Sequence, residues 1–165
     1  MINRRGFLLS GAIGAGALGL ASQVNRSANA ASQGAAAFPV SLSDDEWKKR
    51  LNDRQYQVLR QHGTERPYSS PLNDEHRRGT FACAGCASDL FASSTKFDSG
   101  TGWPSFWAPL KNAVGETKDT SYGMVRVEVH CAQCGGHLGH VFNDGPKPTG
   151  LRYCMNGDAM TFKAI

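Results

Sequence analysis

The most regular alternation of apolar and polar residues lies near the C-terminus, at positions 150–156, which read Gly-Leu-Arg-Tyr-Cys-Met-Asn. This period of two predicts a half-buried strand. Side chains two positions apart share a face of a strand, so Arg152, Cys154 and Asn156 point the same way. The opposite, apolar face consists of Leu151, Tyr153 and Met155. One face of the predicted strand therefore presents a thiol between a guanidinium and an amide.

A second alternating segment, at 124–129, has three valines on one face and Arg126 and Glu128 on the other. It also predicts a strand. Other short β-type runs in the C-terminal half alternate with turn-forming clusters such as the one at 143–146, and no long amphipathic helix is evident. We therefore expect a mainly β fold built from antiparallel sheet.

Helical signals are confined to the segment before these strands. Ser43 and Glu46 form a capping-box pattern, which predicts a short helix extending to about Leu51. A second helix is expected from about Asp53 to Gln61. Its inward-facing residues are expected to be Tyr56, Val58 and Leu59. Small N-terminal helices would thus pack outside the sheet.

The first 30 residues have the pattern of an export signal. Arg4 and Arg5 precede an apolar run to about Val24, and the segment ending at Ala30 supplies a small-residue cleavage site. The paired arginines and the glycine-diluted run resemble a twin-arginine leader, which predicts export to the periplasm and cleavage near Ala30. Retention as a membrane anchor is the alternative, although the run is short and weakly hydrophobic for a stable span.

Beyond residues 1–30, the small and polar segment 31–41 predicts a flexible lead-in, and residues 42–165 have the length of a single domain. The chain has a formal charge of +4, but its leader contains three arginines and no acid, which leaves 15 basic and 14 acidic residues. No Lys/Arg block of the kind that binds nucleic acid or anionic lipid remains. We expect a monomeric mature protein that is not embedded in a membrane and has no nucleic-acid partner.

Four of the five cysteines form two Cys-x-x-Cys pairs, Cys83 with Cys86 and Cys131 with Cys134. Four thiolates are enough to close a tetrahedral structural zinc site, so we expect one Zn²⁺. A redox-active pair is an alternative, but neither pair stands in a thioredoxin-like βαβ context. Two pairs that bind no metal are a third interpretation.

If the pairs bind zinc, Cys154 has no partner left in the sequence. An odd free thiol in an exported protein is a candidate reactive group. The fixed cation of Arg152 favours its thiolate, which is the nucleophilic form. A buried free cysteine acting as a small hydrophobe is the alternative.

Two other stretches carry side chains of chemical interest. Trp103 lies in a loop at 100–107 that is rich in glycine and aromatic residues and either lines a pocket or fills the core. His137 and His140 stand three residues apart. We interpret one or both of them as an acid or hydrogen-bond donor beside Cys154. A purely structural role is the alternative. A second metal site here would need a third ligand, and the sequence shows none at a convincing spacing.

These pieces, in this order, strongly resemble the type B methionine sulfoxide reductases. The resemblance runs from about residue 42 to residue 162 and includes both cysteine pairs. The other matching stretches are Lys96–Gly100, Gly102–Phe106, Gly136–Pro146 and Gly150–Cys154. It implies two antiparallel sheets, a zinc site away from the catalytic face, and reduction of methionine R-sulfoxide, either free or within oxidised proteins.

The resemblance also implies roles for individual residues. Cys154 matches the nucleophile and Asn156 an active-site amide. His137 and His140 match the histidines that hold the sulfoxide oxygen or a water molecule and assist protonation. Trp103 matches the wall against the substrate methyl group. The remaining residues that the resemblance implies are Phe142 and Asp144 at the substrate-binding site and Arg152, which helps to stabilise the thiolate.

Thr101 departs from the family pattern, because many members have a second cysteine at this position. That cysteine condenses with the sulfenic acid formed on the nucleophile. With four cysteines on zinc, this chain has no spare thiol, so we expect an external thiol, such as a thioredoxin-like protein, to reduce the Cys154 sulfenic acid. Two alternatives from other classes are a zinc-dependent protein-binding module without catalysis and a thiol–disulfide oxidoreductase.

Overall fold

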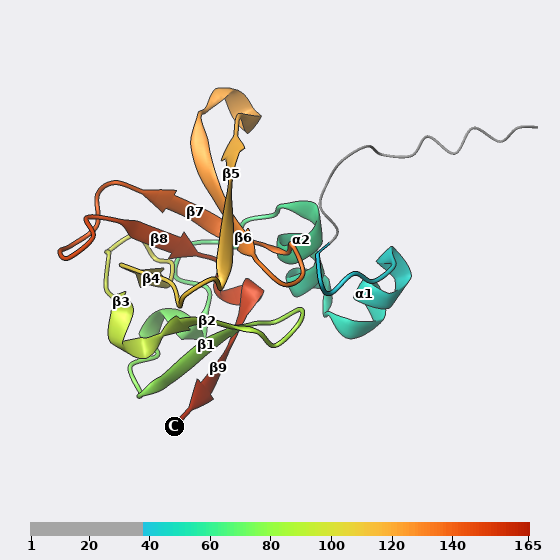
Figure 1. Cartoon of the computed structure of the whole chain (residues 1–165), viewed down its shortest axis with the longest axis horizontal. Coiled ribbons are helices and arrows are strands. Elements are labelled where there is room, and N and C mark those ends of the chain that lie inside the picture. The colour runs from blue at the N-terminus through green and yellow to red at the C-terminus, as the bar shows by residue number, and fades with distance from the viewer. Residues whose placement is uncertain (1–37) are drawn as a thin grey trace, which may run out of the picture. The chain divides into compact units, whose positions relative to one another are not determined.

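The computed structural model describes residues 38–165 (Figure 1). The expected export signal (1–30) and most of the expected lead-in (31–41) lie outside these residues. Among the residues described, no helix has the length and apolar character needed to cross a membrane. Two short helices and two antiparallel sheets make up this part of the chain, which confirms the predicted mainly β fold.

Both helices begin with a capping box and match their predicted positions. In α1 (Asp44–Arg50), the Ser43 hydroxyl accepts the Glu46 amide, and the Glu46 carboxylate accepts the Ser43 amide. α2 (Asp53–Gln61) starts with an equivalent arrangement. The side chains predicted to face inward all pack in or against the core: Tyr56, Val58 and Leu59. The prediction was accurate here because capping is a local interaction.

The smaller sheet has the strand order β2-β1-β9, and the larger has the order β3-β4-β8-β7-β6-β5. The smaller sheet consists of β1 (Gly79–Cys83), β2 (Asp89–Ala92) and β9 (Met160–Ala164). The larger consists of β3 (Lys96–Phe97), β4 (Ser105–Phe106), β5 (Val114–Asp119), β6 (Arg126–Cys131), β7 (His137–Phe142) and β8 (Arg152–Met155). Short 3₁₀ helices occupy Pro71–Asp74, Ser93–Thr95, Ser121–Gly123 and Gly157–Ala159.

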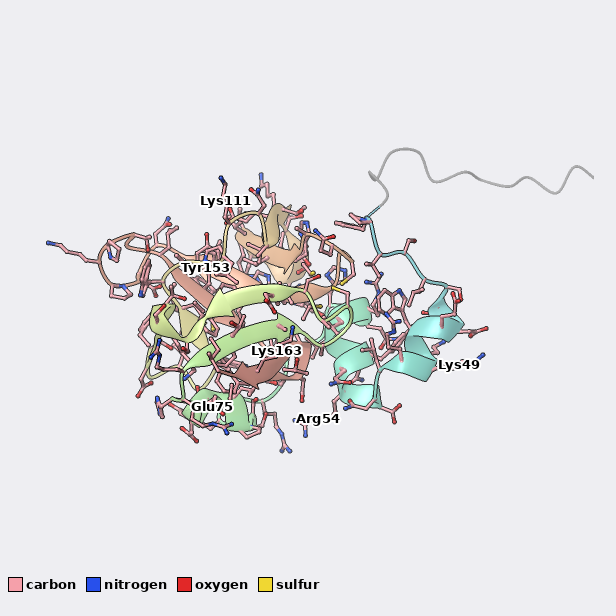
Figure 2. All side chains as sticks on the ribbon, turned by 60° about the horizontal axis from the view of Figure 1, so that its bottom comes forward. Lys49, Arg54, Glu75, Lys111, Tyr153 and Lys163 are labelled. Carbon is pink, nitrogen blue, oxygen red and sulfur yellow. The ribbon has the colours of Figure 1, made fainter. Side chains whose placement is uncertain are left out.

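Aromatic side chains join the two sheets. Phe91 of β2 stacks on Phe106 of β4 with ring centroids 4.3 Å apart, and Phe81 of β1 meets Phe106 edge-on at 4.9 Å. Lys163 of β9 lies on the solvent side of the smaller sheet (Figure 2). Its ammonium group donates to the Asp89 carboxylate of β2 at 2.8 Å. The smaller sheet is thus apolar on its inner face and polar on its outer face.

The segment 124–129 forms a strand later than predicted, and its burial is the reverse of what a valine-rich face suggests. Val125 is 74% exposed and Val127 is 39% exposed, and only Val129 is fully buried. The reason is that β5 and β6 form a hairpin whose tip projects beyond the core (Figure 1). The polar face of β6 is the face that contacts other side chains, because Arg126 binds Asp119 and Glu128 binds His137.

We predict that Phe91→Ala lowers the free energy of unfolding by about 3–5 kcal/mol, because a large buried ring is lost and a cavity is left behind. Val125→Ala is the matched control, and its exposed side chain should change stability by less than about 0.5 kcal/mol. Urea unfolding followed by circular dichroism measures both. A loss below about 1 kcal/mol for Phe91→Ala would contradict this account of the core.

Candidate active site

Cys154 lies in the middle of the larger sheet because β8 is paired on both edges. Its directly opposed neighbours are Ser105 of β4 and His140 of β7. Glu128 of β6 is in turn opposed to His140. Opposed residues of antiparallel strands project from the same face, so these four side chains form one row across four strands. The sheet itself thus brings a thiol, an imidazole and a carboxylate into line.

A cavity of about 150 Å³ opens beside this row. A space of this size accepts a group about as large as benzene. Its lining residues are Thr64, Trp103, Arg126, Gly139, His140, Phe142, Cys154 and Asn156. Gly139 has a steric reason to be there, because a Cβ at this position would lie 2.1 Å from the carbonyl oxygen of Cys154. Five predicted site residues therefore meet around one cavity.

Glu65, which the sequence analysis did not single out, holds two walls of this cavity. Its backbone carbonyl accepts the Trp103 indole N–H at 3.2 Å, and its amide donates to Asn156 Oδ1 at 3.0 Å. Its carboxylate accepts the amides of Gly157 and Asp158, each at 2.7 Å. Burial raises the pKa of this carboxyl group despite these two bonds. A charged residue in a loop gives no periodic signal, which explains why it was missed.

His140 is held at the cavity edge by the β5–β6 hairpin. Its Nε2 lies 2.8 Å from Oδ2 of Asp119, which also accepts the Arg126 guanidinium at 2.7 Å. Burial lowers the pKa of His140, and the bond to Asp119 only partly opposes this. Burial therefore favours the neutral form of the ring over the charged form. Asp119 and Arg126 were not predicted as site residues, because their role depends on pairing between β5, β6 and β7.

His137 does not line the cavity but lies behind His140, with ring centroids 5.4 Å apart. Residues three apart normally face opposite sides of a strand. Here the register of β6 and β7 shifts at Val129 and His130, which inserts one extra residue into β7 and returns both histidines to one face. The Nδ1 of His137 lies 2.7 Å from Glu128 Oε1, and its buried Nε2 has no partner among the described residues.

Arg152 and Asp144 also lie outside the cavity lining. The Arg152 guanidinium donates to both carboxylate oxygens of Asp144, at 2.8 and 2.9 Å. It also lies over the ring of Phe142, 4.4 Å from the ring centroid. The ion pair with Asp144 raises the pKa of Arg152, and the charge of Cys154 acts in the same direction. Arg152 thus lies at the edge of the site and acts on the Cys154 thiol through its positive charge.

The four remaining cysteines form a separate cluster whose ligand atoms all lie within 4.8 Å of one another. The sulfurs of Cys83 and Cys134 are 3.7 Å apart, and those of Cys86 and Cys131 are 3.6 Å apart. A disulfide would require about 2.05 Å, and all five cysteines of the chain are free. Sulfurs that surround a tetrahedral ion at about 2.3 Å lie about 3.8 Å from one another. The cluster therefore fits a bound metal ion.

Comparison with known proteins agrees with this arrangement. A family model described as the SelR domain matches residues 51–164, which include every predicted site residue. The chain belongs to the SelR domain family. It is 54% identical over 127 residues to a protein of Agrobacterium fabrum, which covers 76% of this chain and 94% of that one. A protein of Pseudomonas putida strain W619 is 58% identical over 120 residues, which cover 72% of this chain and 90% of that protein. A protein of Saccharophagus degradans is 59% identical over 119 residues, which cover 71% of this chain and 89% of that protein. All three are named peptide methionine sulfoxide reductase MsrB.

In this SelR domain the pKa of the Cys154 thiol is raised. Burial is the largest influence and outweighs the hydrogen bond from Thr101 and the charge of Arg152, which both lower the pKa. The contribution of Arg152 has the direction expected from the sequence, and burial of the thiol outweighs it. Most of the resting thiol is protonated at pH 7, so a bound substrate meets a thiol that must still lose its proton.

We predict that iodoacetamide alkylates Cys154 slowly at pH 7 and faster as pH rises through the raised pKa, because only the thiolate reacts. Arg152→Ala should slow alkylation further at a given pH, since it removes an influence that lowers the pKa. Arg152→Lys keeps the charge and should stay closer to the parent protein. Mass spectrometry of metal-loaded protein gives the rates. Alkylation that is independent of pH between about 6 and 9 would contradict the raised pKa.

Removing metal from the cysteine cluster should destabilise the whole SelR domain, because the cluster joins the end of β1 to the β6–β7 connection. Binding energy of a structural metal becomes folding energy. We expect Cys83→Ser to lose the ion and to lower the melting temperature by about 10 °C or more. Cys154→Ser, outside the cluster, should keep one ion per chain. Elemental analysis measures the metal content of each variant, and thermal unfolding measures its melting temperature. Equal metal content in both variants would contradict the assignment of the cysteine cluster as the metal site.

Proposed function

We propose that this protein reduces methionine R-sulfoxide to methionine, with Cys154 as the nucleophile. The observation that carries the proposal is the position of the Cys154 thiol, in a small cavity between the His140 imidazole and the Trp103 indole. The names of the family relatives support the same reaction. The opening is large enough for one side chain of a peptide, so both oxidised proteins and free methionine sulfoxide are proposed substrates.

The proposed first step oxidises Cys154 and reduces the substrate sulfur. The thiolate attacks the sulfoxide sulfur and forms a sulfur–sulfur bond, while the sulfoxide oxygen takes up two protons and leaves as water. A water molecule then attacks the Cys154 sulfur, the sulfur–sulfur bond breaks, methionine and a proton are released, and Cys154 ends as a sulfenic acid. The methionine sulfur gains the two electrons that the cysteine sulfur loses. Because the departing oxygen must be protonated, a hydrogen-bond donor beside the thiol lowers the activation barrier. A well-placed acid typically raises the rate by about a hundred- to ten-thousandfold.

The residues around the thiol have separate roles in this proposal. His140 holds the sulfoxide oxygen, directly when its ring is protonated or through a water molecule when its ring is neutral, and Asp119 fixes the orientation of the ring. His137 supports His140 from behind. The Trp103 indole forms the wall against the substrate methyl group and so distinguishes the R from the S diastereomer. Asn156, held by Glu65 and by the Leu138 carbonyl, completes the opposite wall. Phe142 positions the substrate, and Asp144 positions Arg152.

The second proposed step regenerates the thiol with an external reductant. Thr101 Oγ1 lies 3.9 Å from Cys154 Sγ, at the position where a resolving cysteine would stand. Two external thiols, or the dithiol of a thioredoxin-like protein, reduce the sulfenic acid to the thiol, and water and a disulfide are released. The other four cysteines do not take part, because they are gathered in the metal cluster.

We further propose that the metal ion is Zn²⁺, because four thiolates at tetrahedral spacing form a closed structural site for this ion. Its role is structural, and no step of the reaction uses it. The N-terminal sequence supports export by the twin-arginine route, with a monomeric domain from residue 42 acting in the periplasm. Export of a folded, metal-loaded chain would keep the four thiolates from oxidising.

The proposed activity is tested with separate R and S diastereomers of methionine sulfoxide, free and in a peptide, with dithiothreitol as reductant. We expect turnover of the R form only, and a loss of at least about a thousandfold in Cys154→Ser. Metal content and folding of the variant are the controls. Turnover that persists in Cys154→Ser would exclude Cys154 as the nucleophile. No turnover of either diastereomer by the metal-loaded protein would contradict the proposed activity and favour a binding module.

Thr101→Cys should convert the proposed mechanism to one with an internal disulfide. The introduced thiol would lie within reach of Cys154, so we expect a disulfide between the two after one turnover without reductant. In the parent protein and in Thr101→Ser, dimedone should instead label a sulfenic acid at Cys154. Mass spectrometry distinguishes the two products. An internal disulfide to Cys154 in the parent protein would exclude direct reduction by an external thiol.

A further inference from the structure

Three potential metal ligands meet outside the cysteine cluster: His62, Glu128 and His137. His62 ends α2, Glu128 lies on β6, and His137 begins β7. Their ligand atoms all lie within 4.8 Å of one another. In the sequence His137 stands near His140, whereas the fold brings it together with Glu128 of the neighbouring strand and His62 at the end of α2.

The geometry is close to that of a three-ligand metal centre. Nδ1 of His62 lies 3.0 Å from Glu128 Oε1, and Nδ1 of His137 lies 2.7 Å from the same oxygen. Donors that surround a transition-metal ion at about 2.1 Å lie about 3.0–3.5 Å apart. A separation of the three donors by a few tenths of an ångström would therefore admit an ion in place of the hydrogen bonds.

The surroundings favour a cation that enters from solvent. The side chains of His137 and Glu128 are 3% and 14% exposed, whereas that of His62 is 65% exposed. The three residues line a cavity of about 690 Å³, which leaves room for a water ligand. Among the described residues, no lysine or arginine forms an ion pair with Glu128. Arg126, which lines the same cavity, binds Asp119 instead.

We propose that His62, Glu128 and His137 form a second metal site, which takes a divalent transition-metal ion such as Zn²⁺, Ni²⁺ or Co²⁺. Two imidazoles and one carboxylate suit these borderline ions, whereas the thiolates of the cysteine cluster form a softer site. The ring of His62 lies against that of His137, with centroids 5.2 Å apart, so the exposed ligand is already in place.

Occupation of this site has a consequence that rests on the proposed function. His137 lies directly behind His140, so a cation bound to His137 places a positive charge and a fixed ring beside the histidine that faces Cys154. Metal binding at this site therefore inhibits the reductase reversibly, and a chelator restores activity.

Binding is tested with Co²⁺ on Cys154→Ser protein whose cysteine cluster holds Zn²⁺, so that no free thiol competes. We expect one further equivalent of Co²⁺ to bind, with visible absorption of nitrogen and oxygen ligation and no thiolate-to-cobalt charge-transfer band. His62→Asn should lose this equivalent, and it should fold normally, because asparagine tolerates the left-handed backbone of His62 (φ 53°). Glu128→Gln is a second variant that should lose it.

His76→Asn, which removes an exposed imidazole elsewhere, is the matched control and should keep the site. Absence of a further equivalent, retention of it in both His62→Asn and Glu128→Gln, or a thiolate charge-transfer band alone would overturn the proposal. These binding measurements do not depend on catalysis. In the activity assay, Ni²⁺ should inhibit the parent protein at least about tenfold more strongly than His62→Asn, and equal inhibition would overturn the regulatory consequence.

Discussion

β8 has a hydrogen-bonded neighbour on each edge, β4 on one side and β7 on the other, so two independent pairings determine its register. This register sets Cys154 opposite His140 and Ser105 and turns Tyr153 and Met155 into the core. A slip of one residue would bury the thiol and expose the tyrosine. The burial of the apolar face therefore holds the proposed nucleophile in place, and the stability of the sheet and the proposed chemistry depend on the same pairing.

The sequence was informative where interactions are local. Alternation over positions 150–156 predicted the two faces of β8, and the capping residues predicted both helices. The cysteine spacing predicted the cluster, because each Cys-x-x-Cys forms a tight turn by itself: Ala87 and Gly135 donate back to the carbonyls of Cys83 and Cys131. The motifs of the family resemblance predicted five of the eight residues that line the cavity.

What the sequence could not predict depends on register between distant segments. The extra residue in β7 that returns His137 to the face of His140 has no signature in the spacing of the two histidines. The anchoring of Trp103 and Asn156 by Glu65 joins a loop to residues far along the chain. The β5–β6 hairpin is a third case, because Val125 and Val127 near its tip are exposed while its charged residues meet the site. Apolar composition indicates a core only where another layer covers it.

The five sulfurs are equivalent in an unfolded chain, and the fold separates them into four that are placed to bind a metal ion and one that faces a cavity. The residue beside that single sulfur is a threonine, so no neighbouring thiol can trap an oxidised Cys154. In the proposed mechanism its recovery is a bimolecular event whose rate rises with the concentration of reductant in the surroundings. Until it met a reductant, the proposed sulfenic acid would be open to a second oxidation, to sulfinic acid, which ordinary thiols do not reverse. On this proposal the lifetime of the working enzyme depends on the supply of reductant in its compartment.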